Sequence, residues 1–309
     1  MNSTAYLSDL LIQGIGSTLI HTLWQGIIIA LLLKVVLQAI PRKNVELKYW
    51  LSVTALCTLI FWSGYTLNQQ LVPLMDKYSI SAGDVMGISQ GTSVIQFNDL
   101  YSIPFVKNHF NQMMEHLQPY LPSLVVVWLI GVVFFLIRLQ GSMIYLRRLK
   151  TLGTQPIPLV WTRKVEELSQ RLGIRTTVSI VESKLAGVPM VIGHLKPVVL
   201  LPLGILTGLQ THEVEAILAH ELAHIKRLDY LINIAQTVVE SLLFFNPAVW
   251  WISQTIRKQR EHCCDDIAVK CCGNQMVYAS ALSNLGAWSI KPQALGMGLF
   301  KNKNELLMR

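Results

Sequence analysis

Three long apolar segments in the N-terminal part of the chain restrict it to membrane-spanning folds. They run from about residue 10 to 36, 50 to 71 and 121 to 137, and a helix that crosses the hydrocarbon core needs roughly 17 to 25 such residues. Only 14% of all residues are charged, against about 25% in soluble domains. The first segment follows no positively charged n-region, so we expect it to remain as a membrane anchor.

Basic residues next to these segments indicate how the chain is oriented. The short loop 41–48 contains Arg42, Lys43 and Lys48, and further arginines follow the third segment, whereas the loop 72–120 holds two lysines against four acidic residues. Since cytoplasmic loops carry the excess of Lys and Arg, we expect the loop 72–120 outside. The sequence thus predicts a transmembrane region over 1–146, a cytoplasmic domain over 147–300 and a basic tail over 301–309.

Short helices and strands are predicted in the cytoplasmic part, which makes it an α+β module. An amphipathic helix over 162–172 is followed by a β-branched strand over 176–181. The stretch 188–202 predicts two strands joined at Gly193-His194, and its prolines confine the pair to the edge of a small sheet. Such an edge can accept an extended peptide or simply cover the core. Thr211 is expected to cap a further helix.

The most specific chemical signal lies on that last helix, in the segment His220-Glu221-Leu222-Ala223-His224. Residues four apart project from one face of a helix, so both imidazoles can bind one metal ion. Glu221 can accept a proton from an attacking water and pass it to the leaving amine. The pattern predicts a zinc peptidase, in which Zn²⁺ lowers the pKa of the water and polarises the scissile carbonyl.

A catalytic zinc usually has three protein ligands, and the segment 260–266 offers the third. Glu261 and Asp265 lie four residues apart, hence on one helical face. Glu261 is predicted to bind the metal, and Asp265 to accept a hydrogen bond from a ligand histidine. Asn246-Pro247 is predicted to end one helix and begin the next, so the chain turns back toward the histidines. Glu240 is an alternative third ligand.

Together these motifs resemble one family. The histidine helix, then Phe245-Asn246-Pro247-x-x-Trp250-Trp251, then Glu261-x-x-Cys264-Asp265 resemble the membrane metallopeptidases of the beta-lactam-sensing antirepressor family, of the BlaR/MecR type. His21-x-x-Trp24-Gln25 in the first span and the region 189–202 are similar to this family too. The resemblance covers the chain from about residue 15 to 300.

The resemblance implies a gluzincin-type zinc site that faces the cytoplasm of a bacterial inner membrane, below three N-terminal transmembrane helices. It implies proteolysis of the chain itself or of a transcriptional repressor during transmembrane signalling. Sensor members continue into a further span and an extracellular penicillin-binding domain. This sequence ends at residues 306–309 and contains no Ser-x-x-Lys motif, so antibiotic sensing is expected only if the chain is a fragment of a longer protein.

Other interpretations of the sequence stay open. The four cysteines within 263–272 can form a thiolate metal or redox centre, or pack as small apolar residues. The segment 284–300 can be a self-cleavage site or a plain linker. The chain can also be a housekeeping membrane protease or a non-catalytic transducer, although a transducer has no use for Glu221. Its basic residues lie mostly at membrane boundaries, where they attract lipid, so we expect no direct nucleic-acid binding.

Overall fold

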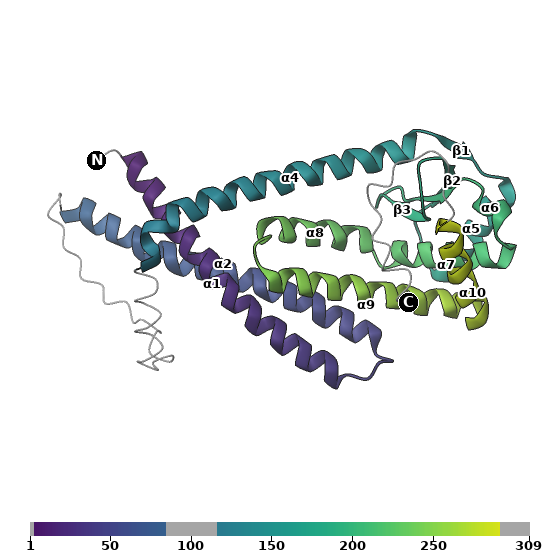
Figure 1. Cartoon of the computed structure of the whole chain (residues 1–309), viewed down its shortest axis with the longest axis horizontal. Helices are drawn as coiled ribbons and strands as arrows, with labels where there is room; N and C mark the ends of the chain where they lie inside the picture. Colours follow the sequence, from purple (N-terminus) through teal and green to yellow (C-terminus); the bar gives the residue numbers. More distant parts are fainter. Residues whose placement is uncertain (1–2, 85–115, 291–309) are drawn as a thin grey trace. The chain divides into compact units, whose positions relative to one another are not determined.

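The computed structural model describes residues 3–84 and 116–290, which are mostly helical (Figure 1). The elements, in chain order, are α1 (Ser3–Ala39), α2 (Val45–Asp84), η2 (Gln118–Tyr120), α4 (Leu121–Thr151), β1 (Thr154–Pro156), α5 (Leu159–Leu172), β2 (Ser179–Ser183), β3 (Met190–Ile192), β4 (Val198–Pro202), α6 (Ile205–Gly208), α7 (Thr211–Lys226), α8 (Asp229–Leu242), α9 (Pro247–Cys272) and α10 (Gln275–Ile290). The predicted mainly helical fold with a small sheet is confirmed.

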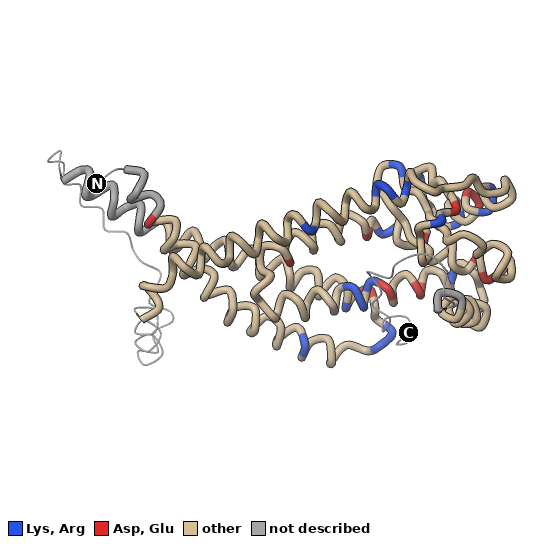
Figure 2. Tube along the Cα trace, turned by 45° about the horizontal axis from the view of Figure 1, so that its top comes forward, with Lys and Arg blue, Asp and Glu red and all other residues tan. Residues whose placement is uncertain are grey.

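The described residues form two compact units that alternate along the chain. The described residues of the first unit are 3–41, 50–84, 116–135 and 239–254, and those of the second are 42–49, 136–238 and 255–290. Lys, Arg, Asp and Glu gather in the second unit and are scarce in the first (Figure 2). The two units therefore have different chemistry, and each is described by itself.

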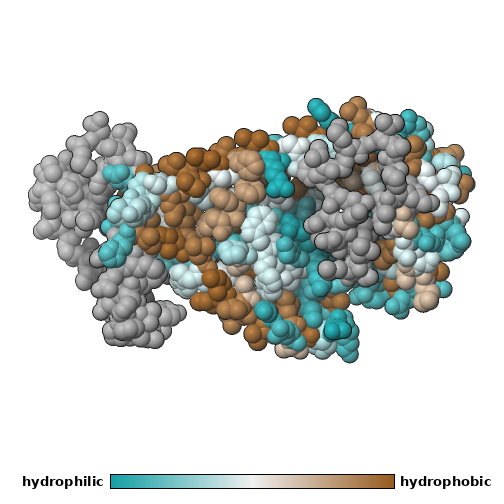
Figure 3. All heavy atoms as spheres, in the orientation of Figure 1, coloured by the Kyte–Doolittle hydropathy of each residue, from teal (hydrophilic) through white to brown (hydrophobic). Residues whose placement is uncertain are grey.

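Three helices of the described residues are long and apolar enough to cross a membrane, as predicted. They cover Asp9–Ala39, Val45–Val72 and Gln118–Thr151. Apolar side chains are exposed on their surfaces (Figure 3), among them Leu31, Leu32, Val35, Phe61, Val127, Ile130 and Phe134. α2 continues to Asp84, so the first part of the loop predicted at 72–120 is helical, and residues 85–115 lie outside the described range. Lipid is the environment that such surfaces fit.

Buried polar contacts connect the helices of the first unit. The side-chain amide of Asn246 donates from Nδ2 to the carbonyl of Thr22 in α1 at 2.8 Å, and its Oδ1 accepts a hydrogen bond from the first turn of α9. Gly26 permits this approach, because a Cβ there would lie 2.7 and 2.9 Å from the two amide atoms. Gln25 donates to the Thr66 hydroxyl of α2 at 2.8 Å. In this unit polar side chains join helices, as is common inside membranes.

The described part of the second unit contains a four-stranded sheet of order β1-β2-β4-β3. β2 pairs in parallel with β4, and β1 and β3 pair antiparallel at the edges. The predicted pair at 188–202 is confirmed, but only β3 is an edge strand, because β4 also pairs with β2 and is buried throughout. β2 begins at Ser179 instead of residue 176. Pro156 of the expected linker lies in β1, an edge strand that tolerates proline.

The core of the second unit is built around α7, which packs against α5, β3 and α10. α5 ends at Gly173, whose φ of +73° is the left-handed conformation expected of a helix C-cap. α10 reaches Ile290, so the segment 284–300 begins as helix, and residues from 291 on lie outside the described range. Each buried Leu, Ile or Val contributes about 1.5–3 kcal/mol. The core includes Val165, Leu168, Val199, Leu201, Val214, Ile217, Leu218, Leu222 and Ala281.

Candidate metal centre

The N-terminus of the histidine helix α7 is fixed by a buried carboxylate. Thr211 is the first residue of α7 and not its cap, since Gln210 is the N-cap and forms a capping box with Glu213. Glu213 accepts the backbone N–H of Gln210 at 3.1 Å, and its other oxygen accepts hydrogen bonds from Ser280 and Asn284 of α10. Burial opposes the charge, but these hydrogen bonds hold the pKa of Glu213 below its ordinary value. The same carboxylate therefore caps α7 and attaches α10 to it.

The structure brings His220, His224 and Glu261 together. The two imidazoles lie one turn apart on α7, with ring centroids 5.0 Å from each other. α9 begins at Pro247, after the predicted break, and carries the Glu261 carboxylate to the histidines. Oε2 of Glu261 lies 3.6 Å from Nε2 of His220 and 4.0 Å from Nε2 of His224. One ligand atom from each residue lies within 4.8 Å of the others.

The far nitrogen of His220 contacts residues of α9 and α10. Nδ1 lies 2.8 Å from the Tyr278 hydroxyl and 3.2 Å from Oδ1 of Asp265. Tyr278 donates its own proton to Asp265 at 2.6 Å. Asp265 thus lies where the helical spacing predicted, beside a histidine. Tyr278 did not emerge from the sequence, because only the packing of α10 on α7 brings it to this position.

Nδ1 of His224, the ring nitrogen that points away from Glu261, contacts a residue that we did not predict. Nδ1 lies 2.8 Å from Oδ2 of Asp229, which begins α8 just after the histidine helix. The thiol of Cys264 lies 3.3 Å from the same nitrogen and donates to Asp229 at 3.4 Å. The signal in the sequence was an acidic residue at the start of the next helix, close behind the second histidine.

This donor set fits a zinc ion. With a proton on each Nδ1, donated toward Asp265 and Tyr278 or toward Asp229, both Nε2 lone pairs face Glu261. Ligands at about 2.0–2.2 Å in a tetrahedron lie about 3.3–3.6 Å apart, and Oε2 of Glu261 lies 3.6 Å and 4.0 Å from the two nitrogens. Carboxylates behind ligand histidines are the usual second layer of zinc sites.

The charge around His220 also favours a cation. Burial alone would lower the pKa of this imidazole, but the hydrogen bonds of Asp265 and Glu261, together with the charge of Glu221, raise it to about 9. A raised pKa means that the surroundings stabilise positive charge. The positive charge can be a proton on the ring or a metal ion at Nε2.

Glu221 follows the first histidine and is nearly enclosed, with 8% of its surface exposed. No other described residue forms a hydrogen bond or ion pair with its carboxylate. Since a buried carboxylate without a partner is costly, the position favours a carboxylate that interacts with something bound in the site.

The other metal-ligand candidates from the sequence do not join this cluster. Among the described residues Glu240 belongs to no group that could hold a metal. Cys264 is the only described cysteine that belongs to such a group. Burial raises the pKa of Cys263 and that of Cys272 to about 11. Protonated thiols are poor metal ligands, which argues against a thiolate centre.

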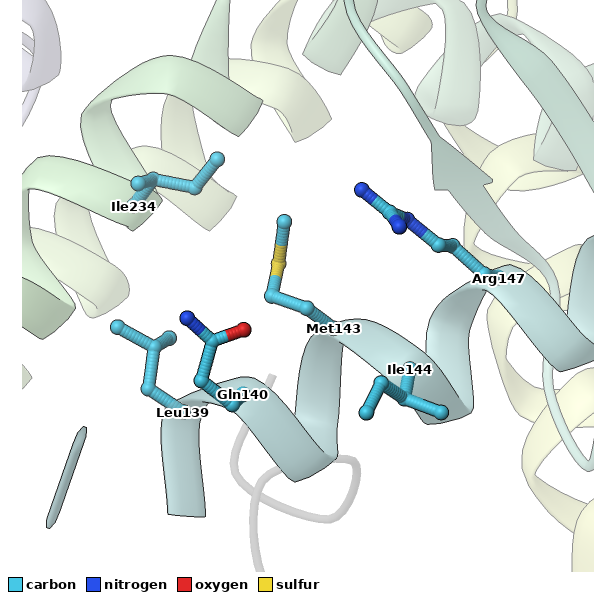
Figure 4. A pocket seen from close by; sticks show the side chains of 6 residues that line it. All are labelled: Leu139, Gln140, Met143, Ile144, Arg147 and Ile234. Atoms are coloured by element: carbon cyan, nitrogen blue, oxygen red, sulfur yellow. The ribbon is translucent and has the colours of Figure 1, made fainter. Parts of the chain in front are cut away.

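A cavity of about 240 Å³ lies apart from these residues, between α4 and α8 of the second unit (Figure 4). In Figure 4 the side chain of Met143 lies in the middle of the space, with Ile234 of α8 opposite. The remaining lining residues come from α4 and are Leu139, Gln140, Ile144 and Arg147. None of them belongs to the candidate metal centre.

Comparison with models of known families assigns the chain to a protein family. A model of the family described as BlaR1 peptidase M56 matches residues 15–309. The chain belongs to this family. M56 peptidases are metallopeptidases, which agrees with the donor set on α7 and α9. The family and the three apolar helices make this M56 chain a membrane protein of a protease family.

Curated relatives match part of the M56 chain. The regulatory protein BlaR1 of Bacillus licheniformis is 27% identical over 148 residues, which are 47% of this chain and 24% of that protein. The methicillin resistance mecR1 proteins of Staphylococcus aureus and Staphylococcus epidermidis are each 32% identical over 82 residues, 26% of this chain and 14% of theirs. The matches therefore span a quarter or less of the relatives' own lengths.

Proposed function

We propose that this M56 chain is a zinc metalloendopeptidase of the bacterial inner membrane that cleaves a protein substrate on the cytoplasmic side. The observation that carries the proposal is the convergence of Nε2 of His220, Nε2 of His224 and Oε2 of Glu261. Two histidines and a glutamate are a ligand set of catalytic zinc, which keeps a further position for water or substrate.

The residues around the three proposed ligands have different chemical roles. When bound, zinc polarises the scissile carbonyl and makes a water molecule more acidic. Glu221 accepts a proton from the attacking water and donates it to the nitrogen of the leaving amine. Asp265 accepts a hydrogen bond from Nδ1 of His220 and so keeps its Nε2 available.

The edge of the sheet supports an extended peptide as substrate. β3 is an edge strand of the described sheet and packs against α7, the helix of the two histidines. An extended peptide can pair with the free side of β3 through its backbone, which aligns it independently of its sequence. A protein segment, in preference to a small molecule, is therefore the proposed substrate class.

The names of the relatives and the charge pattern support a role in regulated proteolysis. One relative is named as a regulatory protein, and others are named for methicillin resistance. Basic residues flank the candidate spans in the loop 41–48 and after residue 137. By the positive-inside rule this charge pattern supports a metal centre on the cytoplasmic side. The proposed substrates are the chain itself or a transcriptional repressor.

Zinc content and cleavage, measured separately, test this function. Elemental analysis of detergent-purified protein should find about one zinc per chain in the native protein and in Glu221→Gln, and none in Glu261→Ala. Cleavage of a peptide library should fall by about 10²–10⁴-fold in Glu221→Gln, because only the proton carrier is lost. Glu166→Ala, an exposed glutamate of α5, is the matched control.

Two results would contradict the proposal. If the native chain binds no zinc, or Glu261→Ala keeps it, the ligand set is wrong. If zinc is bound but cleavage is absent in the native chain and unaffected by Glu221→Gln, the chain is a metal-binding transducer and not a peptidase.

A further inference from the structure

Asp229 reaches His224 because the chain turns sharply between α7 and α8. Leu228 lies in this turn with φ of +58° and is the only non-glycine residue with positive φ among residues 3–84 and 116–290. Leucine rarely adopts this conformation, which persists only where the surroundings hold it. The contact that results is the 2.8 Å hydrogen bond between Oδ2 of Asp229 and Nδ1 of His224.

The second oxygen of Asp229 faces a buried guanidinium. Oδ1 lies 3.6 Å from Nε of Arg227, and the side chains are only 5% and 10% exposed. Neither of these two atoms has a hydrogen-bond partner in the part of the chain that the structure describes. The two opposite charges are buried beside each other, so each partly offsets the cost of burying the other.

Arg227 in turn stacks on a side chain of a candidate membrane helix. Its guanidinium carbon lies 4.5 Å from the ring centroid of Tyr49, which is a cation–π contact. Tyr49 is completely buried. It lies in the first turns of α2, whose residues Val45–Val72 form a candidate span. The row Tyr49–Arg227–Asp229–His224 thus leads from this helix to a proposed metal ligand.

We propose that Tyr49, Arg227 and Asp229 are positioning residues that fix the imidazole of His224 for metal binding. The proposal rests on the proposed zinc site, and it adds that α2 contributes directly to the metal affinity. Asp229 keeps the proton of His224 on Nδ1 and its Nε2 toward Glu261, Arg227 holds Asp229, and Tyr49 holds Arg227. A displacement of Tyr49, which belongs to the second unit like Arg227 and His224, would loosen His224 without touching the metal.

Chelator competition on the full chain in detergent gives the zinc dissociation constant, and so measures the effect of each positioning residue on zinc affinity. Asp229→Ala should bind zinc about 10–100-fold more weakly than native, as expected when the partner of a ligand histidine is lost. Tyr49→Ala should bind about tenfold more weakly, whereas Tyr49→Phe keeps the aromatic face and should stay close to native. Leu47→Ala, an exposed residue of the same helix end, is the control and should be unchanged.

Two further measurements separate positioning from folding. Cobalt in place of zinc gives a visible spectrum that reports ligand geometry, which Asp229→Ala and Tyr49→Ala should shift and Tyr49→Phe should not. Thermal midpoints of the metal-free proteins identify a variant that does not fold. If Asp229→Ala is such a variant, Asp229→Asn decides, since it keeps the shape and loses the charge.

The outcomes distinguish this inference from the proposed function. Native zinc affinity in a folded Asp229 variant and in Tyr49→Ala would overturn the inference, while the zinc site would stand. A native chain that binds no zinc would overturn both. Weaker binding in a Tyr49→Ala protein whose thermal midpoint shows that it folds, restored by Tyr49→Phe, supports the positioning role, because Phe keeps the aromatic face over Arg227.

Discussion

His220 and His224 are supported by carboxylates that reach them in different ways. The two partners of His220 are Asp265 of α9 and Tyr278 of α10. The support of His220 therefore forms only after these distant helices have packed on α7. The carboxylate at His224 is only five residues away, on Asp229 at the start of α8, just after the turn that follows the histidine helix. The difference indicates that the proposed set of three metal ligands depends on two kinds of structure, helix packing at His220 and a strained turn at His224.

The largest effect should come from removing both supports at once. If the two sides act independently, the losses in zinc affinity for Asp229→Ala and Asp265→Ala add in free energy. At about 10–100-fold for each, the double variant should bind about 10²–10⁴-fold more weakly than native, measured by chelator competition. A double variant no weaker than the poorer single variant would show that the two sides are one network.

The His220 side should also make the metal-free protein sensitive to pH. The pKa of His220 in the folded protein is about 9, above its ordinary value of 6.5, so its protonated form stabilises the fold. This contribution to the free energy of unfolding is at most about 3 kcal/mol. It is complete below about pH 6.5 and is lost as the pH rises through 9. Thermal midpoints of the zinc-free protein should therefore fall between pH 6.5 and 9.

Asp265→Asn supplies the control for this pH dependence, since it removes one of the charges that raise the pKa. Its midpoints should change less over the same range. Midpoints of the native zinc-free protein that stay constant from pH 6.5 to 9 would show that His220 does not carry the charge.

The two sides also differ in what the sequence could predict. Glu261 and Asp265 were accessible because helical spacing places residues four apart on one face, and Asn246-Pro247 because proline chemistry ends a helix. Asp229 was missed because its position depends on a positive φ at Leu228. Leucine rarely adopts this conformation, so the sequence does not predict the turn. Tyr278 was missed because α10 is attached through long-range hydrogen bonds to Glu213.

The same distinction holds for the fold. The three spans, α5 and the break before α9 follow from local composition, and each was predicted from it. The interior place of β4 was not, because it depends on a parallel pairing with β2, and strand order is a property of the whole sheet. β1 was missed because a short strand that contains Pro156 looks like a linker.

On the His220 side, the carboxylate should matter more than the phenol. Asp265→Ala removes the charge beside Nδ1 and should weaken zinc binding about 10–100-fold. Tyr278→Phe leaves Asp265 within 3.2 Å of Nδ1 and should cost less, roughly the contribution of one hydrogen bond, about tenfold or less. Chelator competition with both single variants gives the order, and a larger loss for Tyr278→Phe would make the phenol the principal partner of His220.

On the His224 side, the turn itself should matter more than the leucine in it. Leu228 is half exposed, at 48%, and its left-handed conformation costs about 1–2 kcal/mol that glycine avoids. Glycine also loses more freedom on folding, about 0.5–1 kcal/mol, so Leu228→Gly should be neutral or stabilising by up to about 1.5 kcal/mol in thermal unfolding. Its zinc affinity should equal that of the native chain, because the backbone still carries Asp229 to His224. A tenfold loss of affinity in a variant of unchanged stability would mean that the leucine side chain, and not the shape of the turn, holds this side of the metal centre.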